Sequence, residues 1–205
     1  LLAQQLSMRR AYRERRAQSA PAFKDNGPLV SKFLAALPFA LTPAQKRALD
    51  EINRDLAQKH PMQRLLQGDV GSGKTIVAAL ACARAIASGY QAVLMAPTEI
   101  LAEQHFRKID AMLTPLGVQT AWLTGSLKSK AKRIALEAAS GGDAQLIVGT
   151  HALFQAEVAF RKLGLVVIDE QHRFGVDQRL ALRSKGTKGT SHPHQLMMSA
   201  TPIPR

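Results

Sequence analysis

The sequence has one cysteine, few aromatic side chains and no long apolar run, and each shortage excludes a class of protein. The single Cys82 cannot form a disulfide within the chain, so we expect a buried thiol in a reducing compartment. No stretch approaches the ~20 apolar residues of a membrane span, so no membrane partner is expected. The chain also lacks an initiator methionine and a recognisable secretory signal. We therefore expect a cytoplasmic protein, of which this sequence is a fragment.

Acidic residues are also scarce relative to basic ones. The 205 residues include 28 Lys and Arg against 15 Asp and Glu, a formal net charge of +13. A basic surface of this size favours a polyanionic partner such as nucleic acid. Because aromatic residues make up only 5% of the chain, contact with the phosphate backbone fits better than extensive stacking on bases. Charge alone leaves open a solvated surface without such a partner.

A glycine-rich segment at 68–75 is the most informative positive feature. It reads Gly-Asp-Val-Gly-Ser-Gly-Lys-Thr, a full match to the phosphate-binding pattern GxxxxGK[ST]. The pair Leu65-Leu66 before it suits a short buried strand, and the Ala-rich sequence after it suits a helix. This context argues against the alternative, a glycine-rich turn that binds nothing. The residues expected to bind a nucleoside triphosphate here are Gly68, Asp69, Val70, Gly71, Ser72, Gly73, Lys74 and Thr75.

Catalytic roles follow from the chemistry of a few side chains. The glycines allow a nest of N–H donors at the start of a helix, Lys74 supplies positive charge for the terminal phosphates, and Thr75 offers a hydroxyl to Mg²⁺. The apolar run 165–168 ends in Asp169 and Glu170. Asp169 is expected to hold Mg²⁺, and Glu170 to orient or deprotonate an attacking water. The alternative is a helix N-terminus that merely carries acidic side chains. We expect hydrolysis of the nucleotide as well as binding.

From residue 63 onward, strand-like and helix-like segments alternate. Several strands are apolar without alternation, as expected for strands buried on both faces of a sheet. The pattern predicts an α/β fold, a mostly parallel sheet flanked by helices, with the chemistry at the carboxyl ends of the strands. The expected strands cover 63–67, 91–96, 118–123, 145–149, 164–168 and 195–199, and the expected helices 74–88, 99–113, 128–140 and 175–184.

The N-terminal part reads as a helical linker. Residues 1–19 are expected to form a basic helix, and an amphipathic helix follows that ends before Pro38. Thr42-Pro43 is a favourable helix start, with threonine as the N-cap and proline in the first turn. We place the boundary of this linker near residue 35.

Taken in order, the motifs resemble those of superfamily 2 helicases, whose motor lobes have a RecA-like P-loop NTPase fold. Segment 68–75 resembles motif I, Asp169-Glu170-Gln171-His172 resembles the DExH box of motif II, and Ser199-Ala200-Thr201 resembles motif III. Each short motif is weak alone, but the full set in this order is specific. The remaining matches are Ala96-Pro97-Thr98-Glu99 to motif Ia, Thr124-Gly125 to motif Ib, Gly149-Thr150-His151 to the segment before motif II, and Phe39 with 41–45 to the adenine-recognising Q-type motif.

Longer stretches resemble the RecG family, bacterial ATP-dependent DNA helicases that remodel branched DNA. These stretches are 95–99, 102–105, 169–176 and 199–205. The related transcription-repair coupling factor is the alternative, and Gln171 favours RecG because the coupling factor usually has glutamate there. The resemblance implies a nucleoid-associated bacterial motor that uses ATP and Mg²⁺ to remodel stalled forks and Holliday junctions in recombination and repair.

The resemblance also implies partners within a longer chain. Residues 1–35 are expected to be the end of a wedge domain and its connecting helix, and 36–205 the first RecA-like lobe, truncated after motif III. The second RecA-like lobe would supply arginine fingers, each worth roughly 10³–10⁵ in rate. We therefore expect this part alone to bind nucleotide and to be nearly inactive.

Roles for further residues rest on the resemblance. It implies adenine contacts by Phe39 and Gln45, although the sequence around Phe39 is more typical of a core residue. Capping of the next helix is an alternative role for Thr98, Thr124 and Thr150, and the two roles can coexist. No Cys/His spacing supports a zinc site. The implied DNA contacts are Pro97, Thr98, Thr124, Gly125, Thr150 and His151, and the implied coupling residues are His172, Ser199 and Thr201.

Two other functions have less support from the sequence. A P-loop ATPase of another kind, such as a transporter subunit, lacks support because no Leu-Ser-Gly-Gly-type signature occurs and the basic charge would have no role. A DNA-binding module with vestigial nucleotide chemistry is disfavoured by the intact Lys74, Thr75, Asp169 and Glu170.

Overall fold

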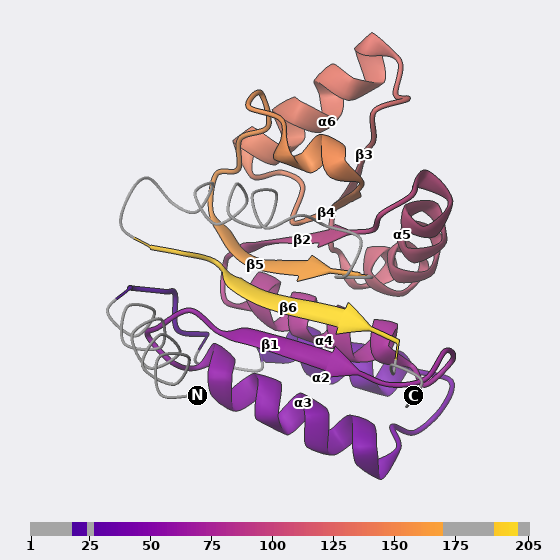
Figure 1. The fold of residues 1–205 in the computed structure, drawn as a ribbon, viewed down its shortest axis with the longest axis vertical. Helices are drawn as coiled ribbons and strands as arrows, with labels where there is room; N and C mark the ends of the chain where they lie inside the picture. The colour runs from indigo at the N-terminus through magenta and orange to yellow at the C-terminus, as the bar shows by residue number, and fades with distance from the viewer. Residues whose placement is uncertain (1–17, 24–26, 170–190, 201–205) are drawn as a thin grey trace, which may run out of the picture.

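A six-stranded sheet organises the chain, and helices cover both of its faces (Figure 1). The computed structural model describes residues 18–23, 27–169 and 191–200. Its strands are β1 (Gln63–Gln67), β2 (Gln91–Met95), β3 (Thr120–Leu123), β4 (Leu146–Gly149), β5 (Leu163–Ile168) and β6 (His194–Ser199). Its helices are α2 (Gly27–Ala36), α3 (Pro43–Leu56), α4 (Lys74–Ala87), α5 (Glu99–Leu113) and α6 (Ser129–Gly141), with short 3-10 helices η1 (Thr114–Leu116) and η2 (His151–Phe154).

The strands lie in the order β1-β6-β5-β2-β4-β3, and every pair among them is parallel. This confirms the predicted α/β class, and each expected strand and helix within the described residues is present close to its expected range. The expected helices at 1–19 and 175–184 lie outside the described residues, apart from the last two positions of the first.

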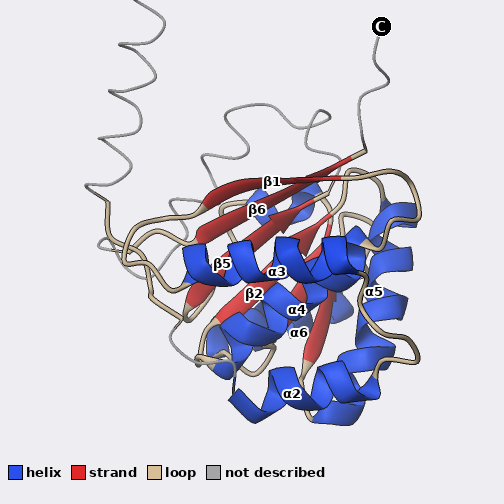
Figure 2. Cartoon of the chain, turned by 90° about the horizontal axis from the view of Figure 1, so that it is seen from below, coloured by secondary structure: helices blue, strands red, loops and turns tan. Residues whose placement is uncertain are grey.

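Two apolar cores lie on opposite faces of the sheet. Successive residues of a strand point to opposite faces, so Ala92 and Leu94 of β2 join one core while Val93 and Met95 join the other. The first core contains residues of α2, α3, α4 and α5, and Figure 2 shows the first three of these helices in front of the sheet. The second core contains residues of α6 and η2. Strands β2, β4 and β5 are buried along their whole length, which explains their continuous apolar sequence.

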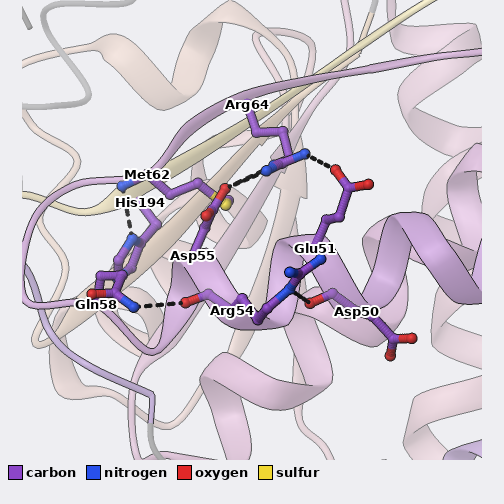
Figure 3. A network of polar contacts seen from close by, with 8 residues as sticks. All are labelled: Asp50, Glu51, Arg54, Asp55, Gln58, Met62, Arg64 and His194. Atoms are coloured by element: carbon purple, nitrogen blue, oxygen red, sulfur yellow. Dashed lines mark hydrogen bonds and ion pairs between the residues drawn. The ribbon is translucent and has the colours of Figure 1, made fainter.

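β1 is less buried than expected. The expectation of a buried strand around Leu65-Leu66 is wrong for Leu65, which is 43% exposed. Within the described residues β1 pairs on one side only, with β6. Its Arg64 forms ion pairs with Glu51 and Asp55 of α3 (Figure 3). An edge position therefore explains why a strand with so many polar residues still belongs to the sheet.

Helix α4 contacts strands β2 and β5 of the sheet as well as helices α2 and α3. Every residue from Ile76 to Ile86 is buried, which small side chains permit because they let neighbouring backbones approach. Cys82 is fully buried, and burial raises the pKa of its thiol to about 12. The expected buried thiol is confirmed. Among the described residues, no helix combines the length and the apolar character needed to cross a membrane.

The part of the chain before β1 also packs against the body of the domain. Phe23, Val30 and Phe33 belong to the same apolar core as α4, and the backbone N–H of Phe23 donates to the Leu56 carbonyl at the end of α3 (2.8 Å). The domain boundary near residue 35 stays a prediction.

The start of α3 has the predicted N-cap, Thr42, and the predicted proline in its first turn. The Thr42 hydroxyl accepts a hydrogen bond from the backbone N–H of Gln45 (3.2 Å), and the Gln45 side chain accepts one from the N–H of Thr42 (2.9 Å). This reciprocal pair is a capping box, and Pro43 occupies the first turn. The cap fixes where α3 begins and thereby where Gln45 lies.

Candidate functional site

The loop at 68–75 connects the carboxyl end of β1 to the first turn of α4. Gly71 and Gly73 have φ angles of +83° and +80°, a left-handed conformation that strains other residues. A Cβ atom at Gly73 would also lie 2.3 Å from Nε2 of Gln45, and one at Gly68 would lie 2.7 Å from Oγ of Ser72. The backbone conformation therefore favours glycine at 71 and 73, and a side chain at Gly73 or Gly68 would also displace the side chain of Gln45 or Ser72.

The side chain of Lys74 returns over this loop. Its ammonium group donates hydrogen bonds to the backbone carbonyls of Gly68 (2.6 Å) and Asp69 (2.9 Å). The positive charge is thus held above the loop, beside the N-terminus of α4, where the helix dipole also favours an anion. This is the arrangement that the phosphate-binding pattern predicts.

A cavity of about 270 Å³ lies at this end of the sheet. It forms because β1, β6 and β5 are neighbouring parallel strands, so their carboxyl ends share one edge. The backbone N–H of Asp169 donates to the Met95 carbonyl (2.8 Å), which fixes that residue at the tip of β5. The cavity is lined by Val70, Gly71, Gly73, Lys74, Thr75, Lys108, Asp169, Met198 and Ala200.

The structure therefore brings six of the predicted site residues to one cavity, among them Lys74, Thr75 and Asp169. Asp169 lies far from Lys74 and Thr75 in sequence, but all three line the same space. The Thr75 hydroxyl and the Asp169 carboxylate are hard oxygen donors of the kind that Mg²⁺ prefers. The donor set at this cavity consequently fits Mg²⁺.

Helix α5 contributes two side chains that the sequence analysis did not assign. Nε2 of His105 lies 2.6 Å from Oδ2 of Asp169, and Lys108, one turn later, lines the cavity. The spacing of these two residues places them on one face of a helix. That spacing is the signal in the sequence, but only the tertiary structure, in which α5 contacts β4 and His105 meets Asp169, shows where the face points.

Gln45 and Phe39, the predicted adenine contacts, lie on either side of the start of α3. The Gln45 amide donates to the Ser72 carbonyl (2.9 Å) and so braces the phosphate loop. Phe39 is 48% exposed, so the interpretation of this residue as part of the core is wrong. It lines a largely apolar cavity of about 390 Å³ together with Leu34, Leu37, Ala40, Leu41, Lys46, Leu49 and Asp50. Adenine binding by both residues stays a prediction.

The predicted DNA contacts follow the other three strands. Thr124-Gly125 and Thr150-His151 come directly after β3 and β4, and Pro97-Thr98 follows β2 after one intervening residue. Since these strands are neighbours, the sheet order separates the predicted nucleotide motifs from the predicted DNA motifs along one edge.

The threonines of these DNA motifs differ in their surroundings. The Thr98 hydroxyl accepts from the backbone N–H of Leu101 (3.3 Å), so the alternative role as an N-cap of α5 is confirmed. Thr124 and Thr150 are buried, and the Thr150 hydroxyl has no hydrogen-bond partner among the described residues. Glu99 accepts from both the backbone N–H and the hydroxyl of Ser126 (3.2 and 2.7 Å), which ties the loop after β3 to α5. DNA contact by these motifs stays a prediction.

The remaining motif residues are only partly described. Ser199 ends β6, and its hydroxyl donates to the Ala200 carbonyl (3.0 Å), beside the phosphate cavity that Ala200 lines. Met198 is buried and Met197 is partly buried. Glu170, Gln171, His172 and Thr201 lie outside the described residues.

Comparison with known proteins agrees with this geometry. The family model of the DEAD/DEAH box helicases matches residues 42–205. The chain is 56% identical to the ATP-dependent DNA helicase RecG of Escherichia coli (strain K12), over 100% of this chain and 30% of that protein. It is 50% identical to RecG of Synechocystis sp., over 97% of this chain and 23% of that protein. The chain thus spans 30% and 23% of the lengths of these two curated relatives.

Solved structures give the same result. A structure of RecG bound to a three-way DNA junction matches with a TM-score of 0.85 and 41% identity, over 98% of this chain and 26% of that chain. The DEAD-box helicase Mss116 matches with a TM-score of 0.63 and 20% identity, over 86% of this chain and 39% of that chain, and supports the fold alone. The chain therefore belongs to the DEAD/DEAH box helicase family, and the predicted RecG-type relationship within superfamily 2 is confirmed.

Proposed function

We propose that this chain is the ATP-binding motor lobe of a DNA helicase that remodels branched DNA in recombination and repair. The observation that carries the proposal is the convergence of Lys74, Thr75 and Asp169 on one cavity at the carboxyl edge of the sheet. A structural ion-pair cluster would not require a glycine loop, a helix N-terminus and a held ammonium group at the same place.

The chemistry assigned to each group follows from its position. The loop backbone and Lys74 bind the β- and γ-phosphates, and Thr75 and Asp169 would hold Mg²⁺, which when bound neutralises the charge that develops on the phosphates. Glu170, which follows Asp169 directly in sequence, orients the attacking water. Gln45 and Phe39 bind the adenine base.

Branched DNA is the proposed substrate because the solved RecG relative is bound to a three-way DNA junction. The net charge of +13 supports a polyanionic partner. A second RecA-like lobe and a wedge domain in the same full-length protein complete the proposed motor, since RecG relatives are more than three times as long as this chain. A bacterial, nucleoid-associated location remains part of the proposal.

Replacement of Lys74 by alanine tests the nucleotide site. A hydrogen bond to a charged group contributes about 1.5–3 kcal/mol, so Lys74→Ala should weaken ADP binding by roughly 10- to 100-fold. Titration calorimetry of the 205-residue chain measures this directly. Lys130→Ala is the matched control, because Lys130 is exposed on α6, outside the cavity. Unchanged affinity of Lys74→Ala for ADP would rule out the assigned site.

A further inference from the structure

The imidazole of His105 contacts the carboxylate to which we assign the metal. Nε2 of His105 and Oδ2 of Asp169 are 2.6 Å apart, and their side chains are only 12% and 14% exposed. An ionised carboxylate only accepts hydrogen bonds, so the imidazole N–H is the donor in this pair. A short contact between two largely buried polar groups restricts the rotation of both side chains.

Both partners are attached to rigid parts of the fold. The backbone of Asp169 is fixed by its hydrogen bond to Met95. On the other side, α5 begins at the Thr98 cap and is anchored to the sheet by the fully buried Ile109 and Leu113. The imidazole therefore holds the carboxylate from a position that does not depend on the phosphate loop.

We propose that His105 is a positioning residue that orients the Asp169 carboxylate for the divalent cation. A carboxylate has about four lone-pair positions, so a hydrogen bond at Oδ2 is compatible with cation binding by the same group. Hydrogen-bonded partners of this kind orient metal ligands, and their loss typically costs about 10- to 100-fold in metal affinity. The inference rests on the proposed nucleotide site, and it assigns a new role to a residue of the helix after motif Ia.

A purely structural role predicts something different. If the pair only joined α5 to β5, its loss would lower stability without a selective effect on the metal. If it positions the carboxylate, its loss should weaken metal binding while leaving the phosphate loop and its lysine intact. The selective readout is therefore the dependence of nucleotide binding on the metal, and not the affinity for nucleotide alone.

Three variants of the 205-residue chain separate these roles. His105→Leu removes the donor, His105→Gln keeps an amide donor near the position of Nε2, and Gln104→Leu is a control at an exposed position on the same helix. Calorimetry measures ADP binding with and without Mg²⁺, and electron paramagnetic resonance measures Mn²⁺ binding to the ADP complex. Circular dichroism verifies that each variant is folded.

We expect His105→Leu to bind Mn²⁺ about 10- to 100-fold more weakly, with ADP affinity in the absence of metal unchanged. His105→Gln should recover most of the metal affinity, and Gln104→Leu should match the parent chain. Parental Mn²⁺ affinity in a folded His105→Leu protein overturns the inference, and so does an equal loss in His105→Gln. If His105→Leu does not fold, a His105→Gln protein with no metal affinity overturns the inference and one with near-parental affinity supports it. Failure of the parent chain itself to bind ADP in a metal-dependent way would overturn the proposed function, and the inference with it.

Discussion

Replacing His194 by leucine should destabilise the fold and remove part of its sensitivity to acid. The imidazole is fully buried at the start of β6. Its Nδ1 accepts a hydrogen bond from the backbone N–H of Met62 (3.0 Å, Figure 3), and its Nε2 lies 2.6 Å from the Pro21 carbonyl. Because Nδ1 is the acceptor, the neutral ring carries its hydrogen on Nε2 and donates to Pro21. The ring also meets Phe23 edge-on, with centroids 5.0 Å apart.

The magnitude follows from these contacts. Leucine leaves the Met62 N–H and the Pro21 carbonyl without their partner, at about 1–3 kcal/mol for each buried group. Loss of the contact with Phe23 adds about 0.5–1.5 kcal/mol, while the apolar leucine side chain restores part of the packing. We therefore expect the free energy of unfolding to fall by about 2–6 kcal/mol.

The pH dependence has a defined sign. Burial lowers the pKa of His194, the Pro21 carbonyl and Asp55 oppose this effect, and His60 adds to it. The folded-state pKa therefore lies below the value of about 6.5 of an unfolded chain, so the unfolded state binds more protons at mildly acidic pH. The stability that neutral His194 contributes to the fold is therefore present above about pH 6.5 and is lost as the pH falls towards the folded-state pKa.

Urea unfolding followed by circular dichroism, at about pH 8 and about pH 5.5, brackets the pKa of an unfolded histidine. The parent chain should lose more stability between these conditions than His194→Leu does. His151→Leu is the control, since His151 is exposed and such substitutions usually change stability by less than about 0.5 kcal/mol. An equal acid-induced loss in the parent and in His194→Leu, or a destabilisation below about 1 kcal/mol, would refute the reasoning.

Three further predictions concern ligands. Phe39→Ala should weaken ADP binding but leave pyrophosphate binding unchanged, because the exposed ring is assigned to the base; equal losses in calorimetry would contradict this. In the full-length protein, Glu170→Gln should bind nucleotide without hydrolysing it, and Asp169→Asn should alter the Mg²⁺ dependence of ATP hydrolysis. Parental ATPase rates in both variants would show that the two acidic residues have been misassigned. Duplex DNA binding by the chain should depend steeply on salt because of the +13 charge. With about three to five phosphates neutralised, a plot of log K against log salt should have a slope of about −3 to −4.5, and a salt-insensitive affinity would argue for another partner.

Local patterns in the sequence were enough to predict the elements and the phosphate loop. Glycines at 71 and 73 are needed for a backbone conformation that those two positions themselves adopt, and the N-cap Thr42 bonds to the backbone of the first turn of its own helix. Continuous apolar runs such as 165–168 indicated strands buried on both faces. Such features depend on neighbours in sequence, so they can be read without knowledge of the tertiary structure.

The tertiary structure decided what depends on the order of strands. The pair Leu65-Leu66 indicated a buried strand, and only the strand order shows that β1 lies at one end of the described sheet, where Leu65 is exposed. The same strand order groups the loop after β1 with Asp169 after β5. The contact between His105 and Asp169 joins residues 64 positions apart, and it exists only because of where α5 packs on the sheet. Sequence patterns specify which chemical groups are present and the local backbone that carries them. Long-range packing determines which of those groups meet, since that depends on how the strands and helices assemble.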